Sequence, residues 1–173
     1  MFRTLFVSSV LLVALLTTGC GEADKASSPD GSVDHMGWLL DSAPPGAVDV
    51  AAVKASAAEG DTVVVRGRIG GRKQPISADS GIFILMDPAL SACSDIPEDT
   101  CATPWDYCCE TPEAITANTA TIQIRDDLGK SISFDSGVLT PLDTVVVTGT
   151  VGPRLNNETL VIYASGVYVV PSG

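Results

Sequence analysis

One segment of the chain, residues 88–118, holds the side chains best suited to thiol chemistry. Four of the five cysteines in the 173-residue sequence lie there, with the spacing Cys-x7-Cys-x6-Cys-Cys. They are Cys93, Cys101, Cys108 and Cys109. Thiols form cystines in oxidising compartments, bind soft metal ions as thiolates, or act as redox nucleophiles. The segment is therefore the first candidate for a functional site.

Cystines are the first expectation for these four thiols if the chain is exported. Pairing of Cys108 with Cys109 is unfavourable, because adjacent Cα atoms are about 3.8 Å apart and relaxed cystines prefer about 4.4–6.8 Å. Two connectivities remain: 93–108 with 101–109, or 93–109 with 101–108. Either would make the segment a rigid loop that holds three candidate binding residues between its crosslinks, Trp105, Asp106 and Tyr107.

The same segment is strongly acidic, which bears on the alternatives of metal binding and redox chemistry. Its stretch from residue 93 to 113 contains no Lys or Arg and six carboxylates, Asp95, Glu98, Asp99, Asp106, Glu110 and Glu113. Acidic surroundings raise thiol pKa values and disfavour a reactive vicinal pair. There is no Cys-x-x-Cys pair, no EF-hand spacing, and the only histidine is His35, so a metal site would have unusual spacing. A metal at the four thiols stays an alternative, and no other cofactor is expected.

The N-terminus has the pattern of an export signal. Arg3 precedes an apolar run over Phe6–Leu16, and small residues lead to Gly19–Cys20. A small residue directly before a cysteine resembles the lipobox of bacterial lipoproteins. The resemblance implies that residues 1–19 are a signal peptide and that the Cys20 thiol is lipidated. It also implies anchoring in a membrane of the cell envelope, facing the periplasm or the outer surface.

Charge and composition describe the exported chain further. The formal net charge is −11, and removal of Arg3 leaves nine basic against 21 acidic residues, a net charge of −12. Such a balance disfavours nucleic acid as a partner. Residues 20–47 are rich in Ser, Gly, Ala, Asp and Pro and are expected to be a flexible tether. Within it, His35, Met36 and Trp38–Leu40 form an apolar island that we expect to dock on the domain.

The elements that must position the thiols follow the tether. A helix is expected over residues 48–59, with Asp49 as its N-terminal cap. Alternating apolar residues then predict five strands, over 61–69, 82–86, 121–134, 143–151 and 159–170. Within the third, residues 126–129 are either a hairpin turn between 121–125 and 131–134 or a bulge in one long strand. The first and fourth strands repeat the pattern Asp-Thr-Val-Val-Val and place Gly67 and Gly149 at the same offset. Interior glycines of this kind indicate strands that bend to close a small barrel.

This pattern over residues 48–171 resembles an OB-fold, with residues 88–118 as a cysteine-rich insertion between strands two and three. The fold class expected is therefore all-β, a five-stranded barrel preceded by a short helix. Together with the lipobox, residues 93–110 resemble uncharacterised bacterial lipoproteins that carry such a domain. That resemblance implies no activity and no site residues.

The sequence favours a binding module rather than an enzyme. Residues 48–171 contain no histidine, so a Ser–His or Cys–His nucleophile cannot be assembled there. We expect a lipid-anchored envelope protein whose loop presents Trp105 and Tyr107, with Asp106, to a protein or a glycan. The alternatives are a metal or redox protein that uses the four thiols, and an envelope structural protein. Oligonucleotide binding is not expected, because it needs a basic groove with stacking aromatics.

Overall fold

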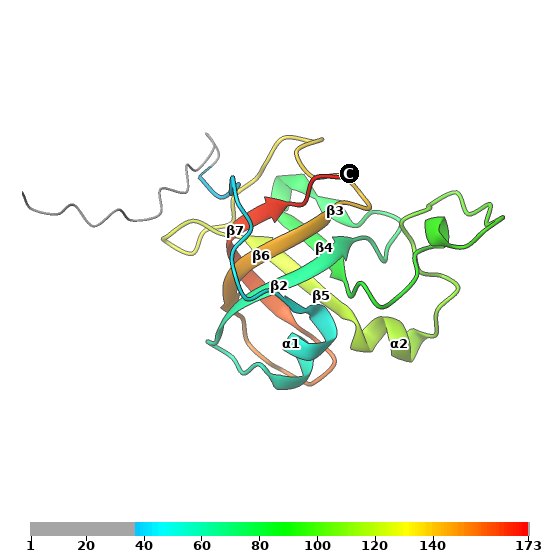
Figure 1. The fold of residues 1–173 in the computed structure, drawn as a ribbon. Coiled ribbons are helices and arrows are strands. Elements are labelled where there is room, and N and C mark those ends of the chain that lie inside the picture. The colour runs from blue at the N-terminus through cyan, green and yellow to red at the C-terminus, as the bar shows by residue number, and fades with distance from the viewer. Residues whose placement is uncertain (1–36, 173) are drawn as a thin grey trace, which may run out of the picture. The chain divides into compact units, whose positions relative to one another are not determined.

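The computed structural model describes residues 37–172. The predicted signal peptide, residues 1–19, and residues 20–36 with the predicted lipidation site Cys20 lie outside the described part. Five main strands and two short helices make up most of the regular structure (Figure 1). In chain order the elements are β1 (Val48–Asp49), α1 (Val50–Ser56), β2 (Thr62–Ile69), β3 (Ile76–Ser77), η1 (Ala78–Ser80), β4 (Ile82–Met86), η2 (Cys93–Asp95), α2 (Pro112–Ala117), β5 (Thr119–Ile124), β6 (Thr144–Val151) and β7 (Val161–Val169), where η marks a 3-10 helix.

The five main strands close into a barrel, which confirms the expected all-β fold. The sheet runs β2–β6–β7–β5–β4, and β4 returns to pair with β2. All of these pairs are antiparallel except β5–β7, which is parallel. The closing pair is short and matches Arg68 with Met86 and Ile69 with Leu85. The predicted insertion occupies the connection between β4 and β5.

Two glycines let the strands approach closely where the barrel bends, as their repeated position predicted. A Cβ atom on Gly67 would lie 2.5 Å from Leu85 Cγ, so a side chain there would push β2 away from β4. A Cβ atom on Gly149 would lie 2.4 Å from the carbonyl oxygen of Tyr163, and the pairing of β6 with β7 shifts register between Thr148 and Gly149. Both positions tolerate only the smallest residue.

Residues before position 48, the predicted start of the domain, also pack on the barrel. Trp38 is buried in the core and its ring packs on Phe134 with 5.4 Å between centroids. Leu39 forms a parallel bridge with Val167 of β7. Trp38–Leu40 of the apolar island therefore dock as expected, whereas His35 and Met36 lie outside the described residues. The prediction of a flexible tether up to residue 47 is wrong for residues 38–40, because burial of the indole and pairing with β7 fix them.

Three local predictions differ from the structure. The helix α1 is shorter than residues 48–59, and Asp49 pairs with Arg66 at 2.8 Å instead of capping it. The buried carboxylate of Asp87 takes that role, because its Oδ2 accepts the Ala51 amide at 2.7 Å. The third strand ends at residue 124, and residues 131–134 form no strand. Ser131 still bridges Arg125, and the Ile132 amide donates to the Ile124 carbonyl at 3.0 Å. Among the described residues no helix is long and apolar enough to cross a membrane.

Candidate functional site

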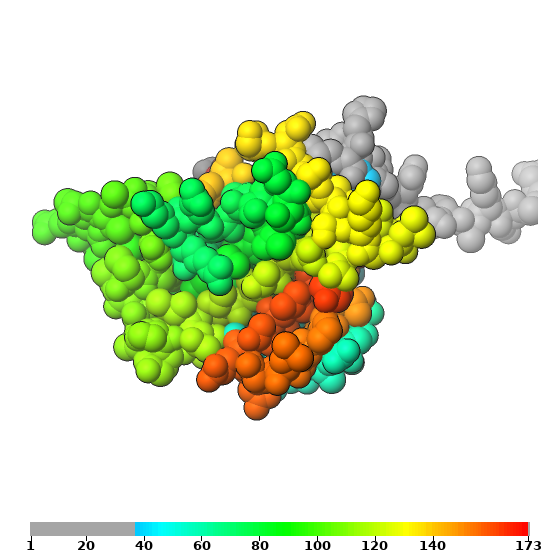
Figure 2. All heavy atoms as spheres, turned by 180° about the vertical axis from the view of Figure 1, so that it is seen from behind, coloured from blue at the N-terminus to red at the C-terminus, as the bar shows by residue number. Residues whose placement is uncertain are grey.

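The insertion, whose last part is α2, projects from one side of the barrel (green in Figures 1 and 2). Two backbone hydrogen bonds fold it back on itself. The Cys93 amide donates to the Asp106 carbonyl at 2.8 Å, and the Ser94 amide donates to the Pro104 carbonyl at 2.8 Å. These bonds set residues 93–94 against residues 104–106, which brings the first cysteine close to the last two.

A buried tyrosine fastens this folded segment to the barrel. Tyr107 is only 1% exposed and packs with Ile84 and Met86 of β4 and with Ala92. The close approach depends on Gly70, because a Cβ atom there would lie 3.0 Å from Tyr107 Cε2. The prediction that Tyr107 faces a partner is therefore wrong, since its ring covers the outer face of β4. Burial also raises the pKa of Tyr107 to about 12.

Trp105 and Asp106 also serve mainly to hold the segment. Trp105 is half-buried, and its indole Nε1 donates to the carbonyls of Arg72 at 3.1 Å and Lys73 at 3.4 Å. The Trp105 carbonyl in turn accepts the Gly71 amide at 2.9 Å. Asp106 is half-buried and accepts the amide of the next residue at 2.8 Å. Their hydrogen-bonding groups are therefore used within the chain.

An ion pair adds a third attachment. The Arg68 guanidinium of β2 contacts Asp95 with two bonds, at 2.7 and 2.9 Å, and also donates to Ser94 Oγ at 2.9 Å. The guanidinium holds the pKa of the Asp95 carboxyl below its usual range, and the carboxylate raises the pKa of Arg68. This pair has no signal in the sequence, since basic residues of a strand give no sign of which acid in a loop they contact.

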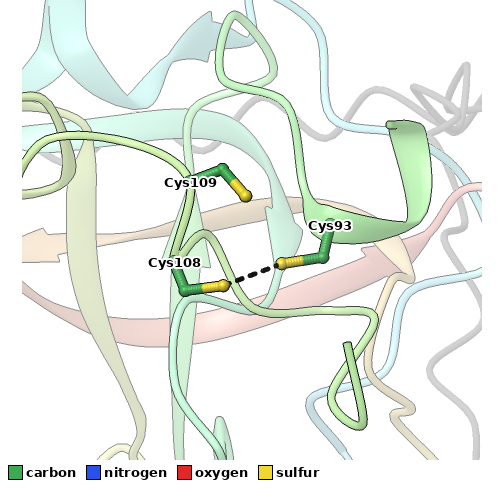
Figure 3. Close-up of side chains that lie close together, drawn as sticks. All are labelled: Cys93, Cys108 and Cys109. Atoms are coloured by element: carbon green, nitrogen blue, oxygen red, sulfur yellow. Dashed lines mark hydrogen bonds between the residues drawn. The ribbon is translucent and has the colours of Figure 1, made fainter. Parts of the chain in front are cut away.

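The folding of the insertion gathers three thiols into a triangle (Figure 3). The Sγ atoms of Cys93 and Cys108 lie 3.4 Å apart, and those of Cys93, Cys108 and Cys109 all lie within 4.8 Å of one another. Cys93 is buried at 2% exposure, whereas Cys108 and Cys109 are exposed. One side of the triangle therefore faces the protein and the other faces solvent.

The fourth cysteine joins the cluster through a carboxylate. Cys93, Asp99 and Cys101 place one sulfur or oxygen atom each within 4.8 Å of one another. Asp99 Oδ1 accepts the Cys101 amide at 2.6 Å, and Cys109 Sγ lies 3.8 Å from Asp99 Oδ2. All four predicted cysteines thus meet around Cys93. Asp99 is a further donor, and nothing in the sequence distinguishes it from the other five acids of the segment.

The protonation of these thiols follows their surroundings. Burial raises the pKa of Cys93 to about 12, and contact with the Cys108 thiol adds to this. The hydrogen bond with Thr103 lowers the pKa of Cys101. Cys93 is therefore a poor nucleophile on its own, and a bound cation is the means by which such a thiol becomes a thiolate.

Among the described residues, all four cysteines are free thiols. The separation of 3.4 Å between Cys93 and Cys108 exceeds the disulfide bond length of about 2.05 Å. Disulfide bonds between these residues stay a prediction, which is based on the export signal in the sequence.

A cleft lies apart from the thiols, between α1, α2 and the β6–β7 connection. It encloses about 710 Å³ and is lined by Lys54, Arg154, Glu113 and Glu158 among others. Its two cations serve the helix ends: the buried Lys54 ammonium donates to the Thr116 and Thr119 carbonyls, and Arg154 donates to the Lys54 carbonyl at 3.0 Å. Burial lowers the pKa of Lys54, with the charge of Arg154 adding to the effect.

Comparison with known proteins finds likeness only among solved structures, since no family model and no curated protein matches. The chain is similar to the hypothetical protein ygiW from E. coli, with 18% identity, a TM-score of 0.40, and coverage of 72% of this chain and 90% of that chain. It is also similar to a DUF3299 family protein from Pseudomonas aeruginosa PAO1, with 13% identity, a TM-score of 0.34, and coverage of 66% and 64%. At these values the likenesses assign no function.

Proposed function

We propose that this chain is a lipid-anchored protein of the cell envelope whose insertion binds a thiolate-seeking metal ion of the zinc class. The observation that carries the proposal is the triangle of Cys93, Cys108 and Cys109 thiols. Four sulfurs at about 2.3 Å from a tetrahedral zinc ion are about 3.8 Å apart. Separations from 3.4 Å to within 4.8 Å are close to that spacing, so small side-chain rotations suffice to bind an ion.

The donor types favour zinc over harder or strictly soft ions. Calcium and magnesium prefer an all-oxygen shell, which three thiols do not provide. Copper(I) prefers sulfur alone, whereas zinc accepts thiolate and carboxylate together, as Cys101 and Asp99 offer them. The exposure of Cys108 and Cys109 leaves the ion accessible to solvent. We therefore propose a binding role in which the ion exchanges, rather than a catalytic one.

The metal proposal is tested on the full-length lipidated protein, extracted from its membrane without oxygen. Native mass spectrometry and elemental analysis should find zinc bound in the wild type and lost in Cys108→Ser. The matched control Ser91→Ala changes an exposed residue just before the cluster and should keep the metal. A metal-free chain that has lost four hydrogens would mean two cystines and would overturn the proposal.

The anchor is tested separately. Lipidation of Cys20 predicts that an alkyne-tagged fatty acid fed to the cells labels the protein and that Cys20→Ser loses both the label and the membrane fraction. The variant Cys101→Ser should keep both. An unlabelled wild-type chain released as a soluble protein would contradict the anchor and leave the metal site unaffected.

A contact with an envelope protein or a glycan is a second candidate function, favoured only by Trp105. Its indole is half-exposed, although the N–H is already bonded to the Arg72 carbonyl. Crosslinking in intact cells, compared between wild type and Trp105→Ala, tests this candidate, and an unchanged pattern would remove it.

A further inference from the structure

The five donor groups of the insertion form two sets that share one sulfur atom. The first set is Cys93, Cys108 and Cys109, and the second is Cys93, Asp99 and Cys101. We propose that the insertion binds two divalent ions of the zinc class, with the Cys93 thiolate bridging them. This inference rests on the proposed function and extends it from one ion to a dinuclear centre.

Geometry gives the first argument. Ligand atoms at about 2.0–2.3 Å from one ion lie at most about 4.6 Å apart, so each set is of a size that one ion can draw together. The structure gives each set within 4.8 Å, and Cys93 Sγ belongs to both. The separation of 3.8 Å between Cys109 Sγ and Asp99 Oδ2 places the outer members of the two sets next to each other. Two ions on one shared sulfur therefore use all five donors.

Charge gives the second argument. Metal binding deprotonates its ligands, so four thiolates and one carboxylate bring five negative charges into one small cluster. One divalent ion leaves three of these charges uncompensated, whereas two ions leave one. The stretch from residue 93 to 113 has no Lys or Arg to supply the difference. The nearby Arg68 is already paired with Asp95. A second divalent ion would supply positive charge at the cluster itself.

The burial of Cys93 gives the third argument. It is the most buried of the four thiols, and its amide is held by the Asp106 carbonyl at 2.8 Å. Cys101 is half-buried, and Cys108 and Cys109 are exposed. A bridging ligand must face both ions, whereas terminal ligands need only one. The fixed inner position of Cys93 suits the bridge, and the outer thiols suit the ends.

The test uses the reduced, metal-free full chain and cadmium ion as a spectroscopic probe for zinc. Anaerobic titration should reach two ions per chain by native mass spectrometry. Cadmium-113 NMR should show two signals that split each other, because coupling between the two nuclei passes through a shared sulfur. Asp99→Asn and Cys101→Ser should each reduce the count to one ion and remove the splitting.

A matched control keeps the result interpretable. Glu98→Gln removes an exposed acid next to Asp99 and should still bind two coupled ions. Circular dichroism checks that each variant keeps the barrel. A wild type that binds a single ion overturns the dinuclear centre and leaves the proposed function standing, whereas no bound ion overturns both. Two ions without splitting, or two ions retained in Asp99→Asn, would overturn the bridge or the second donor set.

Discussion

The barrel and the insertion are held together by different kinds of interaction. Long hydrogen-bonded ladders and a continuous apolar core hold the barrel, and the β2–β6 pair alone runs from Thr62 to Arg68. The insertion has no strand among residues 88–118. It is fastened by one buried ring, one ion pair, one indole N–H and the hydrogen bond from the Gly71 amide to the Trp105 carbonyl. Stability thus resides in one region and the candidate chemistry in the other. Substitutions in the barrel should therefore lower the stability of the whole domain, whereas substitutions in the insertion should have mainly local effects.

The largest effect should come from the barrel. Phe83 of β4 is fully buried in the main core, and Phe83→Ala should lower the free energy of unfolding by about 3–5 kcal/mol. Urea denaturation followed by circular dichroism measures this. Leu128→Ala, at a side chain that is 93% exposed, should change stability by less than about 0.5 kcal/mol. Similar losses in the two variants would show that the core is not where the structure places it.

The next effect should be confined to the insertion. Tyr107→Ala removes the ring that packs on Ile84 and Met86, and should cost about 1–3 kcal/mol. Because the insertion can open while the ladders persist, the loss should appear as faster hydrogen exchange in residues 93–109. Exchange in β2 and β6 should stay near its wild-type rate. Cooperative loss of protection in both regions would mean that the barrel depends on the insertion.

The conservative variant Tyr107→Phe keeps the buried ring and removes only the hydroxyl group, so it should not destabilise the insertion. The phenolic oxygen of Tyr107 is buried and has no hydrogen-bond partner. A buried polar group without a partner costs about 1–3 kcal/mol, so its removal should leave the insertion unchanged or more protected from exchange. A clear loss of protection would show that the hydroxyl has a partner, such as a buried water.

The same contrast explains how far the sequence could predict the structure. Strand periodicity and the repeated glycines predict the barrel, because a strand in a closed sheet must alternate its faces and bend at fixed points. The predicted strand 82–86 matches β4 at both ends. Within the insertion no such period exists, so nothing in the sequence separates inward from outward side chains. For that reason the prediction for Tyr107 is wrong: its ring faces the barrel instead of solvent.

Two signals in the sequence, which the expectations above did not include, point to parts of the insertion. The unbroken apolar run of β4 indicates a strand buried on both faces, and residues 84 and 86 do lie beneath the insertion. The series Thr111-Pro112-Glu113 has the form of a helix start, and the Thr111 hydroxyl caps α2 by accepting the Ala114 amide at 3.1 Å. The thiol triangle had no comparable signal, because it depends on where backbone bonds fold the segment back.

A smaller effect should come from the ion pair between the two regions. Arg68→Met keeps an unbranched apolar side chain on β2 and removes the bonds to Asp95 and Ser94. The expected cost is about 0.5–1 kcal/mol, since both partners are partly exposed and solvent screens the pair. A double-mutant cycle with Asp95→Asn measures the coupling. If the two single changes simply add, the pair does not fasten the insertion.

The smallest effect should come from the indole. Trp105→Phe keeps an aromatic ring and removes only the N–H that donates to the carbonyls of Arg72 and Lys73. Because water can bond to the two carbonyls at this half-exposed site, the loss of stability should be only about 0.5 kcal/mol. It should be visible only as faster hydrogen exchange of the Gly71 amide, which donates to the Trp105 carbonyl. Cadmium binding should be unchanged, because the thiols are held by Tyr107 and the 93–106 hydrogen bond. If Trp105→Phe weakens cadmium binding as much as Tyr107→Ala does, the insertion moves as one rigid unit. Within the insertion, the residues that attach it to the barrel would then also determine metal binding, and the two roles would not be separable.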